Sequence, residues 1–219
     1  MINKLAFCGC SGCGKNYLAE YLVGAHGFKQ LALGSIVKKI ANKLYPKLKL
    51  DYPHGRKDNK IIYTNKNTGI NWTPRDIWVW MNNLKVIDPD IFLNEFIKLH
   101  GKELKNPKKK IVITDLRFTE ACDEFYATPE LEYLQSTGFK VVYIESNTCH
   151  KVKDRDVAES SYEILKEEAD YKFYNKKDEY VSWRKFLHNN KIITGDKQDE
   201  TAIQADCTTH EYCNFGGYF

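Results

Sequence analysis

The sequence lacks any long hydrophobic run. None of its apolar stretches approaches the roughly 20 residues that a membrane-spanning helix needs. The apolar stretch at the start of the sequence is too short for a signal peptide and runs directly into a glycine-rich loop. We therefore expect neither a signal peptide nor a membrane partner.

A strong excess of charge of either sign is also missing. The 33 Lys and Arg residues outnumber the 29 Asp and Glu residues by only four, which gives a net charge of +4. The positive charge is scattered, and the tight run Lys108-Lys109-Lys110 is more typical of a solvated loop than of a binding site. Because no basic stripe is interleaved with aromatic residues, we expect an anionic small molecule as partner and no nucleic acid.

The sequence has no zinc-binding pattern. Cys10 and Cys13 form a C-x-x-C pair, but no second Cys/His pair stands at the spacing of a zinc finger. Both cysteines lie within the glycine-rich loop, where we interpret them as small fillers, because a disulfide there would distort the loop. The seven cysteines therefore favour a reducing compartment, and we expect a cytoplasmic location.

Internal repeats and low-complexity linkers are absent, and the composition is that of one folded domain. Hydrophobic residues make up 42% of the 219 residues and charged residues 28%, and a chain of this length can bury a core. We expect residues 1–194 to form the domain. From residue 195 onward the pattern fades into polar residues, so residues 195–219 are expected to be a C-terminal tail.

Apolar periodicity predicts strands that alternate with helices. Strands are expected at residues 4–8, 28–31, 111–114, 140–144 and 171–174. Helices are expected at residues 16–25, 34–44, 88–100, 119–126, 130–136 and 179–189, and another is expected to begin at Thr73-Pro74. Residues 51–71 are predicted to be a long loop or a small hairpin, and residues 101–110 a charged surface loop. This alternation predicts an α/β fold, in which helices cover both faces of a parallel sheet.

Residues 9–15, Gly-Cys-Ser-Gly-Cys-Gly-Lys, match the phosphate-binding pattern G-x-x-x-x-G-K between a predicted strand and a predicted helix. In such a loop, backbone N–H groups and the helix dipole converge on phosphate oxygens, and glycine lets the backbone wrap closely around them. Lys15 would place its charge on the β- and γ-phosphates of ATP. We predict that ATP is bound by Gly9, Ser11, Gly12, Cys13, Gly14, Lys15 and Asn16.

Asn16 stands where this pattern usually has Ser or Thr, whose hydroxyl holds Mg²⁺. An Asn side chain can offer its carbonyl oxygen to Mg²⁺ directly or through water, and Mg²⁺ commonly keeps several waters. We therefore still expect Mg²⁺ as the cofactor of ATP. The alternative is that Asn16 only satisfies a backbone donor at the start of the helix.

Asp115 and Arg117 follow the predicted strand 111–114. Ligands of open parallel sheets bind at the carboxyl ends of the strands. There Asp115 could lie beside Mg²⁺ or accept a proton, and Arg117 could hold a phosphate with its planar guanidinium. The alternative is an Asp–Arg pair that only closes a loop.

Together with the glycine-rich loop, two runs resemble the deoxynucleoside monophosphate kinases of phages and other viruses. One is Asp115-Leu116-Arg117-Phe118 after an apolar strand, and the other is Thr73-Pro74-Arg75 before an aromatic helix. Residues 33–41 resemble the helix of that family that carries a lysine toward the monophosphate. Ala158-Glu159-Ser160 resembles its short lid motif, although less regularly.

Ala169-Asp170-Tyr171, with Asn175, resembles the closing strand of the family, so the resemblance covers about residues 3 to 190. It implies a three-layer P-loop kinase fold with a small lid at about residues 148–161. It also implies an enzyme that transfers the γ-phosphate of ATP to a deoxynucleoside monophosphate, with Mg²⁺ as cofactor. If the protein is viral, its location is the host cytoplasm.

The resemblance also assigns roles to single residues. The implied catalytic residues are Lys15, Asp115, Arg117 and Arg155, of which Arg155 belongs to the lid with Lys151 and Lys153. The implied acceptor-binding residues are Lys38, Trp72, Arg75, Arg117 and Glu159. The implied metal ligands are Asn16 and Asp115.

Two alternatives to this function stay open. The animal-type phosphomevalonate kinases share the glycine-rich loop and the Ala-Glu-Ser element, so a related small-molecule phosphate kinase is the closest rival. A non-catalytic nucleotide-binding module gains some support from Asn16. The sequence leaves open which base is preferred and whether the chain forms a homodimer, and we expect deletion of the tail to leave kinase activity largely intact.

Overall fold

The computed structural model describes residues 2–48, 50, 60–116, 129–147, 162–176 and 180–193. Several predictions fall outside these residues and are not tested by them. They concern the helix at residues 119–126, the lid at 148–161 and the tail at 195–219, together with Arg117, Lys151, Lys153, Arg155, Glu159 and Ser160.

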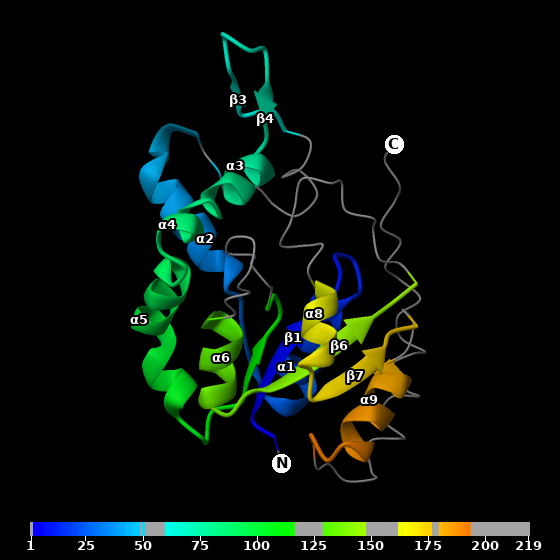
Figure 1. Cartoon of the computed structure of the whole chain (residues 1–219). Helices are drawn as coiled ribbons and strands as arrows, with labels where there is room; N and C mark the ends of the chain where they lie inside the picture. The colour runs from blue at the N-terminus through cyan, green and yellow to red at the C-terminus, as the bar shows by residue number, and fades with distance from the viewer. Residues whose placement is uncertain are drawn as a thin grey trace.

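The central element is a five-stranded sheet in which every pair of neighbouring strands is parallel (Figure 1). Its order is β2-β5-β1-β6-β7, with β1 (Lys4–Cys8) in the middle. The other strands are β2 (Lys29–Leu31), β5 (Ile111–Ile113), β6 (Lys140–Glu145) and β7 (Tyr171–Tyr174). All five lie within a residue or two of the predicted strands, and β7 is at one edge of the sheet.

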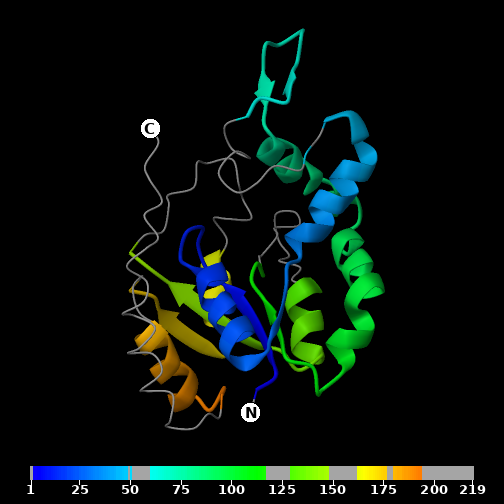
Figure 2. The ribbon, with the colours of Figure 1, turned by 180° about the vertical axis from the view of Figure 1, so that it is seen from behind.

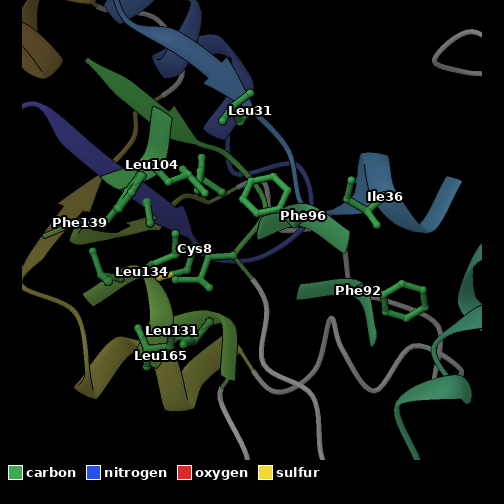
Figure 3. Close-up of a cluster of buried hydrophobic side chains, with 14 of the residues drawn as sticks. Cys8, Leu31, Ile36, Phe92, Phe96, Leu104, Leu131, Leu134, Phe139 and Leu165 are labelled. Atoms are coloured by element: carbon green, nitrogen blue, oxygen red, sulfur yellow. The ribbon is translucent and has the colours of Figure 1, made fainter. Parts of the chain in front are cut away.

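The two faces of the sheet bury different residues, because successive side chains of a strand point to opposite sides. On β1, Ala6 and Cys8 join a hydrophobic cluster with helices α2 (Gly34–Leu44), α5 (Ile91–Lys105), α6 (Pro129–Ser136) and α8 (Tyr162–Glu167) (Figure 3). Leu5 and Phe7 join the cluster on the other face, with α1 (Lys15–His26) and α9 (Tyr180–Asn189). Figure 2 shows α1 and α9 on that side. The predicted three-layer α/β fold with helices on both faces is confirmed.

A small hairpin projects from one end of this core (Figure 1). It pairs β3 (Tyr63–Thr64) with the antiparallel β4 (Asn71–Trp72) and leads into α3 (Pro74–Met81). Thr73 caps α3: its hydroxyl accepts a hydrogen bond from the backbone N–H of Asp76, and the carboxylate of Asp76 accepts one from the N–H of Thr73. With Pro74 at the first helical position, this capping box explains why the helix begins where the sequence predicts.

Residues 101–110 were predicted to be a loop, and the first half of that prediction is wrong. Helix α5 continues to Lys105, because Leu104 extends the apolar face of Leu93 and Phe96 at helical spacing and is fully buried. Gly101 does not stop the helix and is itself a buried residue of α5. The short helices α4 (Leu84–Ile87) and α8 and the 3₁₀ turn η1 (Pro46–Leu48) were not predicted.

Within the described residues, no helix is both long enough and apolar enough to cross a membrane.

Candidate functional site

The glycine-rich loop joins the end of β1 to the start of α1, where three of its glycines have positive φ angles. Gly9 has φ +126°, and a side chain there would collide with the carbonyl oxygen of Ile144. Gly14 has φ +93°, and a side chain there would collide with the amide of Asn175. Only glycine fits both positions, because the backbone of the loop packs directly on the ends of β6 and β7.

Lys15 is the first residue of α1 and turns its ammonium back into the loop. Its Nζ donates hydrogen bonds to the carbonyl oxygens of Gly9 and Cys10, each at 2.7 Å. Helix α1 is described in full, and its first turn holds neither an acidic residue nor a side-chain cap. The helix therefore presents its N-terminal N–H groups and a cation at the same place, which is the arrangement that suits a phosphate.

The loop cysteines differ from each other. Cys13 is a free, buried thiol. Burial raises its pKa, and the positive charge of Lys15, which acts to lower the pKa, only partly offsets this. Cys10 is buried and disulfide-bonded, so the prediction that a disulfide is excluded from the loop is wrong. The reducing compartment inferred from these cysteines loses that support, and a cytoplasmic location stays a prediction. Cys8, at the end of β1, is a free thiol whose pKa burial raises to about 12.

Asn175 fixes the far side of the loop. It follows the edge strand β7, is buried, and its Nδ2 donates to the carbonyl oxygen of Cys13 at 2.9 Å. The contact joins residues 162 positions apart in the chain. It explains why the sequence motif that includes Asn175 lies beside the phosphate loop at the carboxyl end of the sheet.

Asp115 lies just beyond β5 and holds the beginning of α2. Its Oδ1 accepts a hydrogen bond from the N–H of Leu33, and its Oδ2 accepts one from the N–H of Gly34, both at 2.7 Å. A carboxylate is favourable at a helix N-terminus, where unpaired N–H groups and the positive end of the dipole meet. Asp115 therefore positions α2, and its predicted part in a metal site stays a prediction.

Asn16, Thr114 and Asp115 all line one cavity. The Oδ1 of Asn16 accepts from the Nε2 of Gln30 at 3.4 Å, and the same nitrogen lies 3.4 Å from the Oγ1 of Thr114. Oxygen donors of this kind suit Mg²⁺, which binds few protein groups and keeps phosphate and water ligands. Asn16, Thr114 and Asp115 therefore fit a Mg²⁺ whose remaining ligands are phosphate and water. Among the described residues, no group of three or more His, Cys, Asp or Glu could hold a metal ion.

The cavity has a volume of about 510 Å³ and extends from the phosphate loop to α2, α3, α4 and α6. Lys38 on α2 and Arg75 on α3, both predicted to bind the acceptor, line it. The Nζ of Lys38 lies 4.7 Å from the centre of the Trp78 ring, a cation–π contact that joins α2 to α3. A second group of cations therefore shares the cavity with the phosphate loop.

Most of the predicted site residues that the structure describes meet in this cavity. They are Ser11, Gly12, Gly14, Lys15, Asn16, Lys38, Arg75 and Asp115. Gly9 and Cys13 belong to the loop without lining the cavity. Trp72, predicted to bind the acceptor, does not line it either and packs half-buried against the core, whereas Trp78 does line it.

The residues of the cavity wall that sequence reasoning missed include Lys85 on α4, Phe92 on α5 and Glu130 on α6. Lys85 and Glu130 form an ion pair whose side chains are only 12% and 7% exposed. No local pattern distinguishes these residues, because each belongs to a different element and they meet only in the folded chain.

No protein-family model and no curated protein matches the chain. Similar solved structures include a dephospho-CoA kinase from Campylobacter jejuni, with 14% identity, a TM-score of 0.42 and coverage of 87% of this chain and 96% of that one. Another is a shikimate kinase from Bacteroides thetaiotaomicron, with 12% identity, a TM-score of 0.37 and coverage of 86% and 98%. At this level of similarity, the function has to be argued from the residues of the cavity.

Proposed function

We propose that this chain is an ATP-dependent kinase that transfers the γ-phosphate of ATP to a nucleoside monophosphate, and to a deoxynucleoside monophosphate in particular. The observation that carries the proposal is that one cavity joins the phosphate loop and Lys15 to a second pair of cations, Lys38 and Arg75. A protein that only binds or hydrolyses ATP needs the first group alone. A kinase with a phosphorylated acceptor needs both.

Phosphoryl transfer depends on alignment and on neutralisation of charge. Two polyanions must approach each other, so Lys15 would offset the charge of ATP, and Arg75 and Lys38 that of the acceptor phosphate. The acceptor oxygen is ionised at neutral pH and needs no strong base. This agrees with the geometry of Asp115, whose two oxygens already accept hydrogen bonds from α2.

Asn16 and Asp115 are the residues that we expect to hold Mg²⁺, with Thr114 beside them. The ion would neutralise phosphate charge and orient the γ-phosphate. The resemblance adds Arg117 as a contact to the transferred phosphate, Arg155 as part of the lid over ATP, and Glu159 as an acceptor-binding residue. A closing lid would exclude water and suppress hydrolysis of ATP.

The test is ADP formation by the purified protein with ATP and Mg²⁺, against dAMP, dGMP, dCMP, dTMP and mevalonate 5-phosphate. We expect turnover with at least one nucleotide and none with mevalonate 5-phosphate. The variant Lys15→Met should reduce turnover by roughly 10²- to 10³-fold, since it removes one charge from the transferring phosphates. The proposal fails if the wild-type protein forms no ADP with any nucleotide.

A non-catalytic nucleotide-binding module is the second candidate, because Asn16 replaces the usual hydroxyl and its oxygen already accepts from Gln30. Tight binding of ATP without acceptor-dependent turnover would favour it. Restoring the hydroxyl with Asn16→Ser then gives a direct comparison. A module that became active only in this variant would identify Asn16 as the cause of inactivity.

A further inference from the structure

The wall of the cavity contains a largely buried ion pair that the roles assigned above do not use. Lys85 on α4 and Glu130 in the first turn of α6 line the cavity, and the Nζ of Lys85 donates to the Oε1 of Glu130. The two side chains are 12% and 7% exposed. The apolar residues Phe92 and Leu93 line the cavity as well, and the Nζ of Lys85 lies 6.0 Å from the centre of the Phe92 ring.

Stability alone is a weak reason for such a pair. Removing two charges from water is costly, and replacing a buried ion pair by apolar residues of similar size is often neutral or stabilising. Lys85 and Glu130 do connect α4 to α6, but apolar side chains could make the same connection. Their position in the wall of a cavity gives the charges a second use.

The pair is neutral as a whole, in contrast to Lys38 and Arg75 in the same cavity. A neutral pair has little net attraction for a further phosphate but offers a hydrogen-bond donor next to an acceptor. Glu130 uses Oε1 for Lys85, and among the described residues Oε2 has no partner. The ammonium of a lysine carries three N–H donors, so it can serve Glu130 and a ligand together.

We propose that Lys85 and Glu130 recognise the hydrogen-bonding edge of a nucleobase, that is, a planar nitrogen heterocycle with a donor and an acceptor at adjacent positions. Lys85 donates to the ring nitrogen or carbonyl oxygen, and Glu130 accepts from the neighbouring N–H or amino group. This inference rests on the proposed function and extends it: Lys38 and Arg75 bind the phosphate of the acceptor, and Lys85 and Glu130 bind its base. The two are specificity-determining residues, whereas transfer itself depends on the phosphate loop.

The test is the double variant Lys85→Met with Glu130→Leu, which removes both charges and leaves neither one buried alone. We expect the KM for each accepted nucleotide to rise about 10- to 100-fold, the range for losing a paired contact to a base edge. The KM for ATP should stay the same. The inhibition constant of deoxyribose 5-phosphate, an acceptor without a base, should also stay the same, because that molecule engages only the phosphate-binding residues.

The matched control is the double variant Lys29→Met with Glu103→Leu. It removes the ion pair between Lys29 and Glu103, which lies outside the cavity. It should change none of these constants. A merely structural role for Lys85 and Glu130 would lower the melting temperature and shift the constants for nucleotides and deoxyribose 5-phosphate alike. If the double variant has no melting transition, Glu130→Gln, which keeps the shape of the side chain, decides the question in the same assays.

Calorimetric binding of the same nucleotides separates this inference from the function on which it rests. Wild-type protein that binds nucleotides without forming ADP contradicts the kinase but not the base site. Unchanged nucleotide affinity in a folded double variant overturns the base site, whether or not the wild-type protein is a kinase. Wild-type protein that binds none of the nucleotides overturns both.

Discussion

Single residues decide whether the phosphate loop keeps its shape, and Gly14 is the sharpest case. A methyl group there would displace the amide of Asn175 from its hydrogen bond with Cys13 and would also sit on a backbone with φ +93°. We expect Gly14→Ala to weaken ATP binding, measured by calorimetry, by about tenfold or more, because a lost buried hydrogen bond alone costs about 1–3 kcal/mol.

The matched control is Gly24→Ala on the same helix, α1, where an added methyl group meets no atom within 4 Å. This change should leave ATP affinity unaltered and stabilise the protein by about 0.5–1 kcal/mol, since alanine favours a helix over glycine. Equal ATP affinity in the two alanine variants would contradict the role given to Gly14.

A substitution of Asp115 distinguishes a role in positioning α2 from a role in binding the metal. In Asp115→Asn an NH₂ group replaces one oxygen, and it cannot accept from Leu33 or Gly34, so we expect a loss of about 1–3 kcal/mol in the free energy of unfolding. Because α2 carries Lys38, the KM for the acceptor should rise. Steady-state kinetics at several Mg²⁺ concentrations provide the measurement.

A different pattern is expected if Asp115 acts mainly on the metal. In that case kcat falls and the Mg²⁺ requirement rises, while the KM for the acceptor changes little. Observing this pattern with unaltered stability would refute the positioning role.

Whether a site residue could be predicted depends on how far it lies in the sequence from the residues it meets in the site. Lys15 and the loop glycines form a contiguous run, and Asp115 directly follows a strand, so the sequence alone pointed to each of them. Lys85 and Glu130 are 45 residues apart and meet through the packing of α4 on the rest of the fold, which no local pattern encodes. Trp72 was predicted to bind the acceptor, but Trp78 lines the cavity instead, which also depends on how the elements pack.

Among the elements, α3 links stability to the acceptor side, because Arg75 and Trp78 both lie on it. Thr73→Ala removes the capping box and should lower the free energy of unfolding by about 1 kcal/mol. We also expect a higher KM for the acceptor, since fraying of the first turn moves Arg75. Urea denaturation and steady-state kinetics test the two effects separately.

Thr68→Ala in the exposed hairpin turn is the control for that change. It should alter the free energy of unfolding by less than about 0.5 kcal/mol. A destabilisation as large as that of Thr73→Ala would show that the capping box has no special weight.

Elements with a strong local signal were predicted well. Strand β5 is a continuous apolar run, β1 is apolar after Lys4, and Thr73-Pro74 marks the start of α3 by its own chemistry. The end of α5 was wrong because Gly101 and the charged residues around it suggested a loop, while burial of Leu104 outweighed them. Helix α4 has only four residues, too few to show a helical period.

At the scale of the whole molecule, the sheet separates the two halves of the site. The phosphate loop leads into α1, which packs on one face, while α2 and α3 bring the second group of cations from the elements that pack on the other. The two groups meet only at the carboxyl edge of the sheet. The order of the strands in the sheet therefore determines the site as much as any motif does. The sequence could not show this order, because it depends on pairing between strands that lie far apart in the chain.

The two hydrophobic clusters also indicate how much of the chain the fold needs. Ile192 and Ile193 are 0% and 4% exposed in the cluster with α1 and α9, and the N–H of Ile2 donates to the carbonyl oxygen of Ile192 at 3.2 Å. A chain that ends at residue 194 keeps both side chains. We therefore expect deletion of residues 195–219 to leave the melting temperature and ADP formation largely unchanged.

Deletion of residues 192–219 is the control for this prediction. It removes both isoleucines, each of which contributes about 1.5–3 kcal/mol by its burial, from a domain whose total stability is only about 5–15 kcal/mol. This shorter chain should melt at a clearly lower temperature. The chain of residues 1–194 could instead keep its melting temperature and lose most of its turnover. That result would mean that residues 195–219 take part in the reaction without supporting the fold.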